Sequence, residues 1–219
     1  MLTACWSVKG GSGLSVVAAA LAVLRRRGDG ALLVDLDGDQ PGILGCAEPA
    51  APGGGITGGF AVAVADDVAT AIRSAEIDVA DGLALLPRGP GPLPAAGRAT
   101  AFVEHLARER RAVIVDCGRP GADDGLAAAV VGSADRSLLV VRPCFLALRR
   151  ATTAPWRPDG VVLVTEVGRA LGARDVEGVL GAPVVAVVEV DPAVARVVDA
   201  GLLLSRPPRI LSGPLADVA

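Results

Sequence analysis

Apolar residues in this chain come in blocks that are separated by polar and glycine-rich stretches. Short runs of β-branched and aliphatic residues, apolar at nearly every position, predict strands that are buried on both faces. Between them, apolar residues recur three and four positions apart, a spacing that predicts helices. The predicted strands cover residues 2–8, 31–36, 83–86, 112–115, 137–141, 161–165 and 184–188, and the helices cover 14–26, 64–75, 100–110, 126–131, 146–153, 173–180 and 192–199.

The alternation of strand and helix favours parallel pairing, because parallel neighbours need a crossover connection that is usually a helix. We therefore expect an α/β fold with a doubly wound, mostly parallel sheet and helices on both faces. Two Gly/Pro-rich stretches, 48–60 and 87–97, predict loops. Both are too short to link independent domains, so we expect a single domain over residues 1–219.

Composition narrows the function classes. Of 219 residues, 52% are apolar and 21% charged, which allows a large core and excludes a disordered tail or a coiled coil. The formal net charge is -3, whereas a dedicated nucleic-acid binder is usually strongly basic. No apolar run reaches the roughly 18 residues of a membrane span, and the longest, 16–24, stops at three arginines. A cytoplasmic protein is the expectation.

Several kinds of catalytic centre are ruled out by missing residues. The chain has one histidine, His105, in a charged helical segment where we expect no functional role, and it has no tyrosine. A three-histidine metal centre therefore cannot form within one chain. No two cysteines have CxxC spacing, so buried thiols are a better interpretation than a zinc or redox site. The four cysteines are Cys5, Cys46, Cys117 and Cys144.

A glycine-rich segment, residues 7–15, lies between the first predicted strand and the first predicted helix. Glycines there let backbone N–H groups close around an anion, and the start of a helix adds its positive dipole. Strand, glycine loop, serine and helix follow in the order that a phosphate-binding loop requires. Among 21 basic residues Lys9 is the only lysine, which points to a specific role inside this loop.

Residues 9–15 resemble the deviant Walker A motif of the ParA/MinD family of P-loop ATPases, written KGGxGK[ST]. Lys9 falls on the signature lysine and Ser15 on the hydroxyl that ligates magnesium. Leu14 falls on the general P-loop lysine, which is missing here. The divergent CpaE/TadZ-like branch, which localises pili, is the most similar. Four further segments are similar to family motifs. Residues 33–40 carry the DxDxxQ pattern, and residues 113–118 resemble the Walker B strand. Residues 134–141 resemble the strand that follows it, and residues 187–194 with Gly201 resemble the segment near the nucleotide base.

The resemblance implies ATP or ADP with magnesium as cofactors, and roles for particular residues. Asp37 would orient the attacking water, and Lys9 would reach the partner's nucleotide across a homodimer. Ser15 and Asp116 would hold magnesium, with Asp35 beside the metal. The nucleotide itself would be bound by Gly10, Gly11, Ser12, Gly13, Leu14, Ser15, Val16 and Arg119.

Leu14 limits what this site can do. A charge-assisted hydrogen bond from lysine to phosphate contributes about 1.5–3 kcal/mol, so its loss weakens binding roughly 10- to 150-fold. Three predicted strands end close to an arginine, namely Arg88, Arg119 and Arg142, and one of these could replace the lysine. Arg119, which follows the Walker B strand, is the best candidate; in the alternative interpretation, arginine is simply the default cation of this chain.

Three functions remain open. The first is a slow, dimerisation-coupled ATPase for partition, septum placement or pilus localisation; the second is an inactive pseudo-ATPase that acts as a dimeric scaffold for an unidentified protein partner. The third, a DNA-binding partition protein, is disfavoured by the acidic charge balance. A MinD-like membrane anchor is rejected because residues 210–219 contain no Lys or Arg. The chain has no asparagine to read adenine, and Thr165-Glu166 stand where the family often carries one, so base specificity is open.

Overall fold

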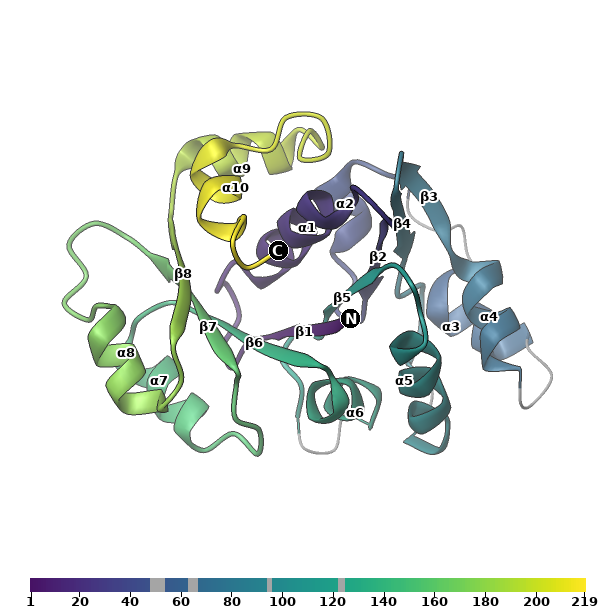
Figure 1. The fold of residues 1–219 in the computed structure, drawn as a ribbon, viewed down its shortest axis with the longest axis horizontal. Helices are drawn as coiled ribbons and strands as arrows, with labels where there is room; N and C mark the ends of the chain where they lie inside the picture. Colours follow the sequence, from purple (N-terminus) through teal and green to yellow (C-terminus); the bar gives the residue numbers. More distant parts are fainter. Residues whose placement is uncertain (48–53, 63–66, 94–95, 122–124) are drawn as a thin grey trace.

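The computed structural model describes residues 1–47, 54–62, 67–93, 96–121 and 125–219. Its strands form one eight-stranded sheet in the order β3-β4-β2-β5-β1-β6-β7-β8 (Figure 1). All pairs are parallel except β3 with β4. The strands are β1 Leu2–Trp6, β2 Ala31–Asp35, β3 Ile77–Ala80, β4 Leu83–Leu86, β5 Ala112–Asp116, β6 Arg136–Val141, β7 Gly160–Thr165 and β8 Val184–Glu189.

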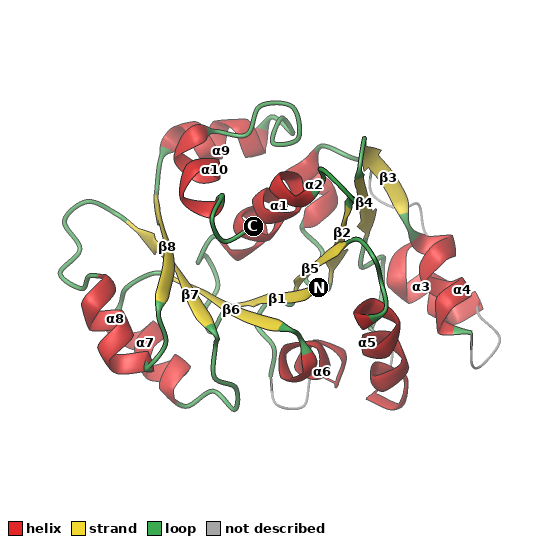
Figure 2. Ribbon diagram, in the orientation of Figure 1, coloured by secondary structure: helices red, strands yellow, loops and turns green. Residues whose placement is uncertain are grey.

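Helices cover both faces of the sheet (Figure 2). On one face lie α1, α2, α9 and α10, and on the other α3 to α8. The expected doubly wound, mostly parallel architecture is therefore confirmed. The helices are α1 Leu14–Arg25, α2 Gln40–Leu44, α3 Gly55–Val62, α4 Val68–Ala75, α5 Ala99–Ala107, α6 Gly125–Ser133, α7 Phe145–Thr152, α8 Ala173–Leu180, α9 Pro192–Asp199 and α10 Arg209–Leu215, with a 3-10 turn at Ala96–Arg98.

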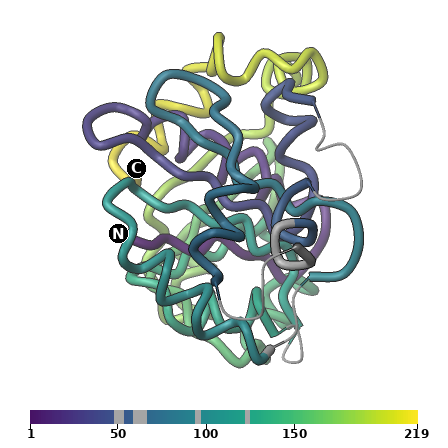
Figure 3. The backbone as a smooth tube through the Cα atoms, turned by 90° about the vertical axis from the view of Figure 1, so that its right-hand side faces the viewer, coloured from purple at the N-terminus to yellow at the C-terminus, as the bar shows by residue number. Residues whose placement is uncertain are grey.

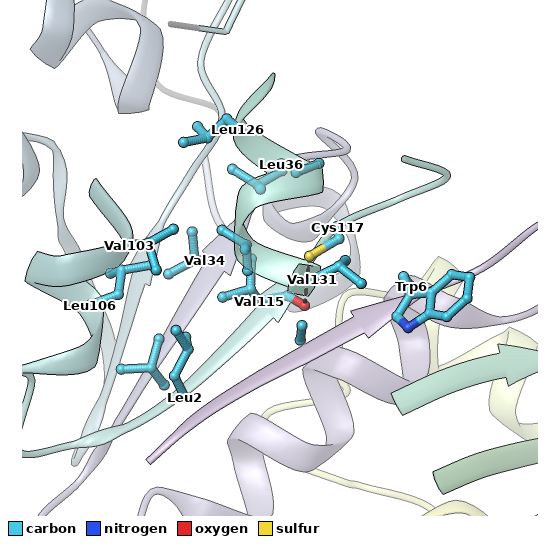
Figure 4. Packing of buried hydrophobic residues seen from close by; sticks show 14 of the residues in the cluster. Leu2, Trp6, Val34, Leu36, Val103, Leu106, Val115, Cys117, Leu126 and Val131 are labelled. Carbon is cyan, nitrogen blue, oxygen red and sulfur yellow. Dashed lines mark hydrogen bonds between the residues drawn. The ribbon is translucent and has the colours of Figure 1, made fainter. Parts of the chain in front are cut away.

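The core has two parts, one on each side of the sheet. Figure 4 shows the part under α5 and α6, where Leu2, Val34 and Val115 pack with side chains from both helices. Cys117 lies in this cluster and is buried, as the interpretation of buried thiols predicts. Trp6 packs edge-on against Trp156, with ring centroids 5.8 Å apart, and its indole N–H donates to the hydroxyl of Ser137 at 2.9 Å.

The structure differs from the predicted elements in five places. Residues 55–60 were expected in a loop but belong to α3; residues 48–53 lie outside the described part. The short helices α2 and α10 and the edge strand β3 were not predicted. The helix expected over 64–75 begins at Val68 in the described part, where the side chain of Asp67 caps it by accepting from Thr70 N at 2.9 Å.

The two chain ends lie on the same side of the molecule (Figure 3). The guanidinium of Arg136 donates to the carbonyl oxygen of Val218 at 2.7 Å, which ties the end of the chain to the start of β6. In the described ranges, no helix is both long and apolar enough to cross a bilayer.

Candidate functional site

The loop between β1 and α1 lies at the carboxyl edge of the parallel strands. Gly11 and Gly13 have φ angles of 72° and 85°, in the left-handed region that glycine adopts without strain. Nothing lies within 4 Å of a Cβ built on Gly10 or Gly11, so the backbone there is open on that side. No side chain caps α1, and its first amides remain available to an anion.

A cleft of about 490 Å³ opens over this loop. It brings together all the predicted site residues except Asp35 and Asp116, which lie buried next to it. Sequence reasoning missed Val198 and Asp199 at the end of α9 as part of the cleft, and the likeness of residues 187–194 to a base-contacting segment was the only signal for that region. The predicted residues that line the cleft are Lys9, Gly10, Gly11, Ser12, Gly13, Leu14, Ser15, Val16, Asp37 and Arg119.

Two carboxylates end neighbouring strands next to the cleft. Asp35 of β2 and Asp116 of β5 are register partners, and both are fully buried. Asp35 organises the turn that follows β2, because its two oxygens accept three backbone N–H bonds. The donors are Asp37 N at 3.1 Å, Gly38 N at 2.6 Å and Gln40 N at 3.1 Å.

Gln40, for which no role was predicted, links the start of α1 to the carboxylate at the end of β5. Its side-chain amide donates to Asp116 Oδ2 at 2.7 Å and to the carbonyl oxygen of Ser15 at 3.0 Å. The Ser15 hydroxyl also interacts with Asp116 and lowers the pKa of that carboxyl. The Oε1 atom of Gln40 is buried without a hydrogen-bond partner in the described ranges. Its place as the last residue of the DxDxxQ pattern was the signal that could have found it.

The donor set suits a magnesium ion that is shared with a nucleotide. In the described part of the chain, no group of three or more His, Cys, Asp or Glu side chains could hold a metal by itself. Mg²⁺ commonly takes only one or two protein ligands and fills its shell with phosphate oxygens and water. Ser15 and Asp116 fit that arrangement and would hold the ion, and Gln40 Oε1 would remain free to accept a further hydrogen bond beside it. Asp35 already accepts three amides, so its place beside the metal stays a prediction.

Burial shapes the titration of both carboxylates. It raises the pKa of Asp35 to about 7, with the charge of Asp116 adding to the effect and backbone donors opposing it. It raises the pKa of Asp116 to about 6, against the hydrogen bonds from Gln40 and Ser15. A cation that binds here displaces these protons, because it favours the ionised form.

This titration predicts that stability falls as the pH rises from about 5 to about 8 without divalent cations. The unfolded chain loses both protons near pH 4, but the native state keeps them until about pH 6–7, so it binds more protons in between. We expect a loss on the order of 4 kcal/mol between pH 5 and pH 8, measured by urea unfolding. Magnesium should restore more stability at pH 8 than at pH 5.

Asp116→Asn should flatten that pH dependence, whereas Asp217→Asn, a change at an exposed aspartate, should leave it unchanged. Equal slopes in the parent and in Asp116→Asn would show that the buried pair does not control it.

Asp37 lies over the glycine that follows β5. A Cβ built on Gly118, where φ is +61°, would lie 2.5 Å from Asp37 Oδ1, so a larger residue there would displace the Asp37 carboxylate. Partial burial, with Asp39 nearby, raises the pKa of the Asp37 carboxyl, and the positive charges of Arg88 and Arg119 lower it. The Asp37 carboxylate therefore faces the cleft beside two cations.

The structure separates the three arginines that were proposed to replace the missing lysine. Arg88 donates to the carbonyl oxygen of Leu36 at 2.8 Å. Arg142 pairs with Glu166 at 2.9 Å and lines a different cavity. Arg119 is exposed, lines the cleft and forms no salt bridge within the described ranges. Of the three, Arg119 has its charge available to a ligand over the loop.

Leu14 has two environments. It is only 6% exposed and packs with Cys5 and Val17 in the core on the α1 face, but it also lines the cleft. The loop therefore has an intact backbone and an apolar side chain where the resemblance calls for a cation.

A second, apolar cavity of about 280 Å³ adjoins the cleft. The two share Gly13, Val16, Val198 and Asp199, so a ligand can extend from one into the other. The segment expected near the base, 187–194, contributes to its wall. Its apolar lining suits the flat face of an aromatic base. The aliphatic residues around it are Val16, Val17, Val164, Val188, Val190, Val194, Ala195, Val198 and Leu211.

The fold is similar to that of solved ParA and MinD proteins. A ParA family ATPase from Chlorobium tepidum TLS superposes with a TM-score of 0.77 at 19% identity, over 99% of this chain and 97% of that one. The septum site-determining protein MinD from Pyrococcus horikoshii OT3, complexed with Mg-ADP, gives 0.75 at 18% identity, over 99% and 93%. MinD in the MinC:MinD complex from Aquifex aeolicus gives 0.74 at 19%, over 99% and 93%.

These solved structures establish the fold of the chain along its whole length, and at such low identities they establish no more than the fold. No protein-family model matches the sequence. No curated protein matches it either.

Proposed function

We propose that this chain is a ParA/MinD-like positioning or partitioning protein that binds ATP or ADP weakly, with magnesium, through a degenerate phosphate loop. The observation that carries the proposal is the cleft over residues 9–16, where the backbone of a phosphate loop is open and Leu14 replaces its cation. The Mg-ADP in the Pyrococcus horikoshii MinD supports the choice of ligand.

Each residue has a role in this proposal. Backbone amides of residues 10–13 bind the phosphates, and Ser15 and Asp116 hold magnesium. Magnesium, when bound, neutralises charge on the phosphates and so supports transfer to water. Asp37 accepts a hydrogen bond from the attacking water and orients it. Lys9, exposed at the loop tip, contacts the partner's nucleotide in a homodimer.

Arg119 supplies the positive charge that Leu14 cannot. Its side chain lines the cleft and its charge lowers the pKa of Asp37, and a phosphate would offer two acceptors for its planar fork. A flexible arginine at a loop is less preorganised than a lysine at a helix start, so nucleotide binding is weak and hydrolysis slow.

The second candidate function is a pseudo-ATPase that acts as a dimeric scaffold. The observation that favours it is the burial of Leu14, which leaves an apolar side chain against the phosphate position. In this case the protein acts through its partner surfaces, and the MinC partner in the Aquifex aeolicus complex is consistent with either candidate.

The first test is calorimetric titration with Mg-ATP and Mg-ADP. We expect weak binding that requires magnesium, and we expect Arg119→Ala to weaken it by roughly tenfold or more, the value of one charge-assisted hydrogen bond. Arg206→Ala removes the same charge from an exposed site away from the cleft and should have no effect. No heat and no thermal shift at millimolar nucleotide would contradict nucleotide binding and would favour the second candidate function, the scaffold.

The second test concerns Lys9. If it contacts the partner's phosphates, Lys9→Ala should reduce nucleotide-dependent dimerisation, measured by light scattering, without a change in thermal stability. Lys9→Arg should also be impaired, because a planar guanidinium does not replace a compact ammonium in a tight loop. A parent that stays monomeric at saturating nucleotide, or a Lys9→Ala variant that dimerises equally well, would rule out this role.

A further inference from the structure

The wall of the apolar cavity beside the cleft carries a single kind of side-chain donor. Its charged side chains are the carboxylates of Glu189, Asp191 and Asp199 and the guanidinium of Arg142. No amide or hydroxyl side chain lies among the described residues that line this cavity. An ionised carboxylate only accepts hydrogen bonds, whereas a guanidinium only donates them. A base that enters the cavity therefore meets Arg142 as the side chain that can donate to it.

Strand geometry turns Arg142 toward this cavity. The side chains of Leu138 and Val140 in β6 lie in the core on the α1 side of the sheet. Side chains alternate along a strand, so Arg142, two positions after Val140, lies on that side as well. Val164 of the neighbouring strand β7 belongs to the same part of the core and lines the same cavity. Arg142 thus stands at the carboxyl end of the sheet, beside the aliphatic wall.

An ion pair fixes the position of this guanidinium. Arg142 Nη1 donates to Glu166 Oε1 at 2.9 Å, and Arg169 Nη2 donates to the other oxygen, Oε2, at 2.6 Å. This pair does not saturate the guanidinium, because the Nε atom of Arg142 is buried and has no acceptor within the described ranges. An arginine that is already held in place loses little conformational entropy when it donates its remaining N–H groups to a ligand.

The two common purines differ in what they offer an arginine. Guanine presents two acceptors side by side, O6 and N7, and a guanidinium can donate to both at once. Adenine presents its N6 amino group beside N7, so an arginine in the same place would bring two donors together. Asn or Gln suits adenine, but the chain has no asparagine, and its single glutamine, Gln40, is engaged at Asp116 and Ser15. The side chain at this wall therefore suits guanine.

The carboxylates of the wall act in the same direction. Guanine carries an N1–H and an N2 amino group on the edge next to O6, whereas the N1 atom of adenine is itself an acceptor. A carboxylate beside N1 therefore attracts guanine and repels adenine. Cation and carboxylates on this wall favour the same base.

We propose that the apolar cavity selects a 6-oxopurine, so that the chain binds guanine nucleotides more tightly than adenine nucleotides, with Arg142 as the residue that determines this specificity. The inference rests on the proposed function, because it requires a nucleotide whose phosphates lie over residues 9–16. The cleft and the cavity share parts of their walls, so one nucleotide can occupy both. Weak binding of ATP and ADP then has two causes, Leu14 at the phosphates and Arg142 at the base.

Calorimetric titration with the magnesium complexes of GDP, IDP and ADP tests the specificity. We expect GDP to bind at least tenfold more tightly than ADP, because a bidentate contact to the correct base discriminates by roughly tenfold or more. IDP is the matched ligand, since its base keeps the O6, N7 and N1–H of guanine but lacks the N2 amino group. IDP should therefore also bind more tightly than ADP.

Arg142→Gln replaces the guanidinium by an amide, which can accept from adenine N6 and donate to N7. We expect the ratio of the GDP and ADP dissociation constants to change at least tenfold in favour of ADP. This ratio reports on the base, because a change at the phosphates affects both nucleotides alike. Arg206→Gln makes the same exchange at an exposed position outside the cavity and should keep the ratio of the parent. Thermal unfolding checks that the variants fold, and Arg142→Ala, with the same direction of change, replaces Arg142→Gln if that variant does not.

The outcomes separate this inference from the proposed function. If none of the diphosphates binds at millimolar concentration, nucleotide binding itself is wrong and the inference is overturned with it. If ADP binds as tightly as GDP or more tightly, or if the Arg142 variant keeps the ratio of the parent, nucleotide binding stands and the specificity assigned to Arg142 is wrong.

Discussion

Leu14→Lys should tighten Mg-nucleotide binding by roughly 10- to 150-fold, the largest functional effect that we expect from one substitution. The variant places an ammonium at the start of α1, where the backbone of the loop is already open. The side chain of Leu14 both packs in the core and lines the cleft, so the methylene stem of a lysine can follow the same path and extend its charge into the cleft. Calorimetric titration with Mg-ATP measures the change.

Leu14→Met is the matched control, because it keeps the volume and the apolar character of the parent. It should bind nucleotide as the parent does. If Leu14→Lys remains folded and binds no better than Leu14→Met, Leu14 is not the limiting defect of the loop. Combining Leu14→Lys with Arg119→Ala then tests compensation, since the loss of Arg119 should matter less once the lysine is restored.

The fold was predictable where burial alone determines the local pattern. The strands β1, β2 and β4 to β7 are apolar runs, and both of their faces are covered by helices; β8 is an apolar run at the edge of the sheet and is partly exposed. β3 was missed because it is an edge strand of four residues whose side chains are partly or fully exposed, so no apolar run marks it.

α3 was not predicted because its first turn is stabilised by hydrogen bonds to a segment that is distant in sequence. Three of its eight residues are glycines, which disfavour a helix on their own. The backbone N–H groups of Ile56 and Thr57 donate to the carbonyl oxygens of Pro87 and Arg88 at 2.8 and 3.0 Å. Those bonds come from the loop after β4, and no pattern within residues 55–62 contains them.

The site was predictable where its residues are close in sequence. Residues 9–16 form the loop and the first turn of α1, and Asp37 and Arg119 follow strands whose ends meet beside it. The hydrogen bond from Gln40 to Asp116 depends on the pairing of β2 with β5 in the sheet. The part of the cleft wall that α9 provides depends on a contact between segments that are distant in sequence. Sequence favoured Arg119 over Arg88 and Arg142 because it follows β5, but only the structure shows which guanidinium groups are already engaged.

Gly45→Ala should produce the largest loss of stability among the single substitutions considered. Gly45 ends α2 with a φ of 71°, and a Cβ there would collide with the backbone carbonyl of Gly201. The left-handed conformation costs an alanine about 1–2 kcal/mol, and the collision forces the two backbones apart in addition. We expect a loss of about 3 kcal/mol or more in the free energy of unfolding, measured with urea.

Gly28→Ala separates the two causes. Its φ is similar, 81°, but nothing lies within 4 Å of a Cβ there, so it should cost only the conformational part, about 1–2 kcal/mol. The difference between the variants measures the packing of α2 against Gly201, which follows α9, and the last residues of α9, Val198 and Asp199, line the cleft. Gly45→Ala should therefore also weaken nucleotide binding, whereas Gly28→Ala should not. Equal losses of stability in the two variants would show that the Gly45–Gly201 approach does not hold these segments together.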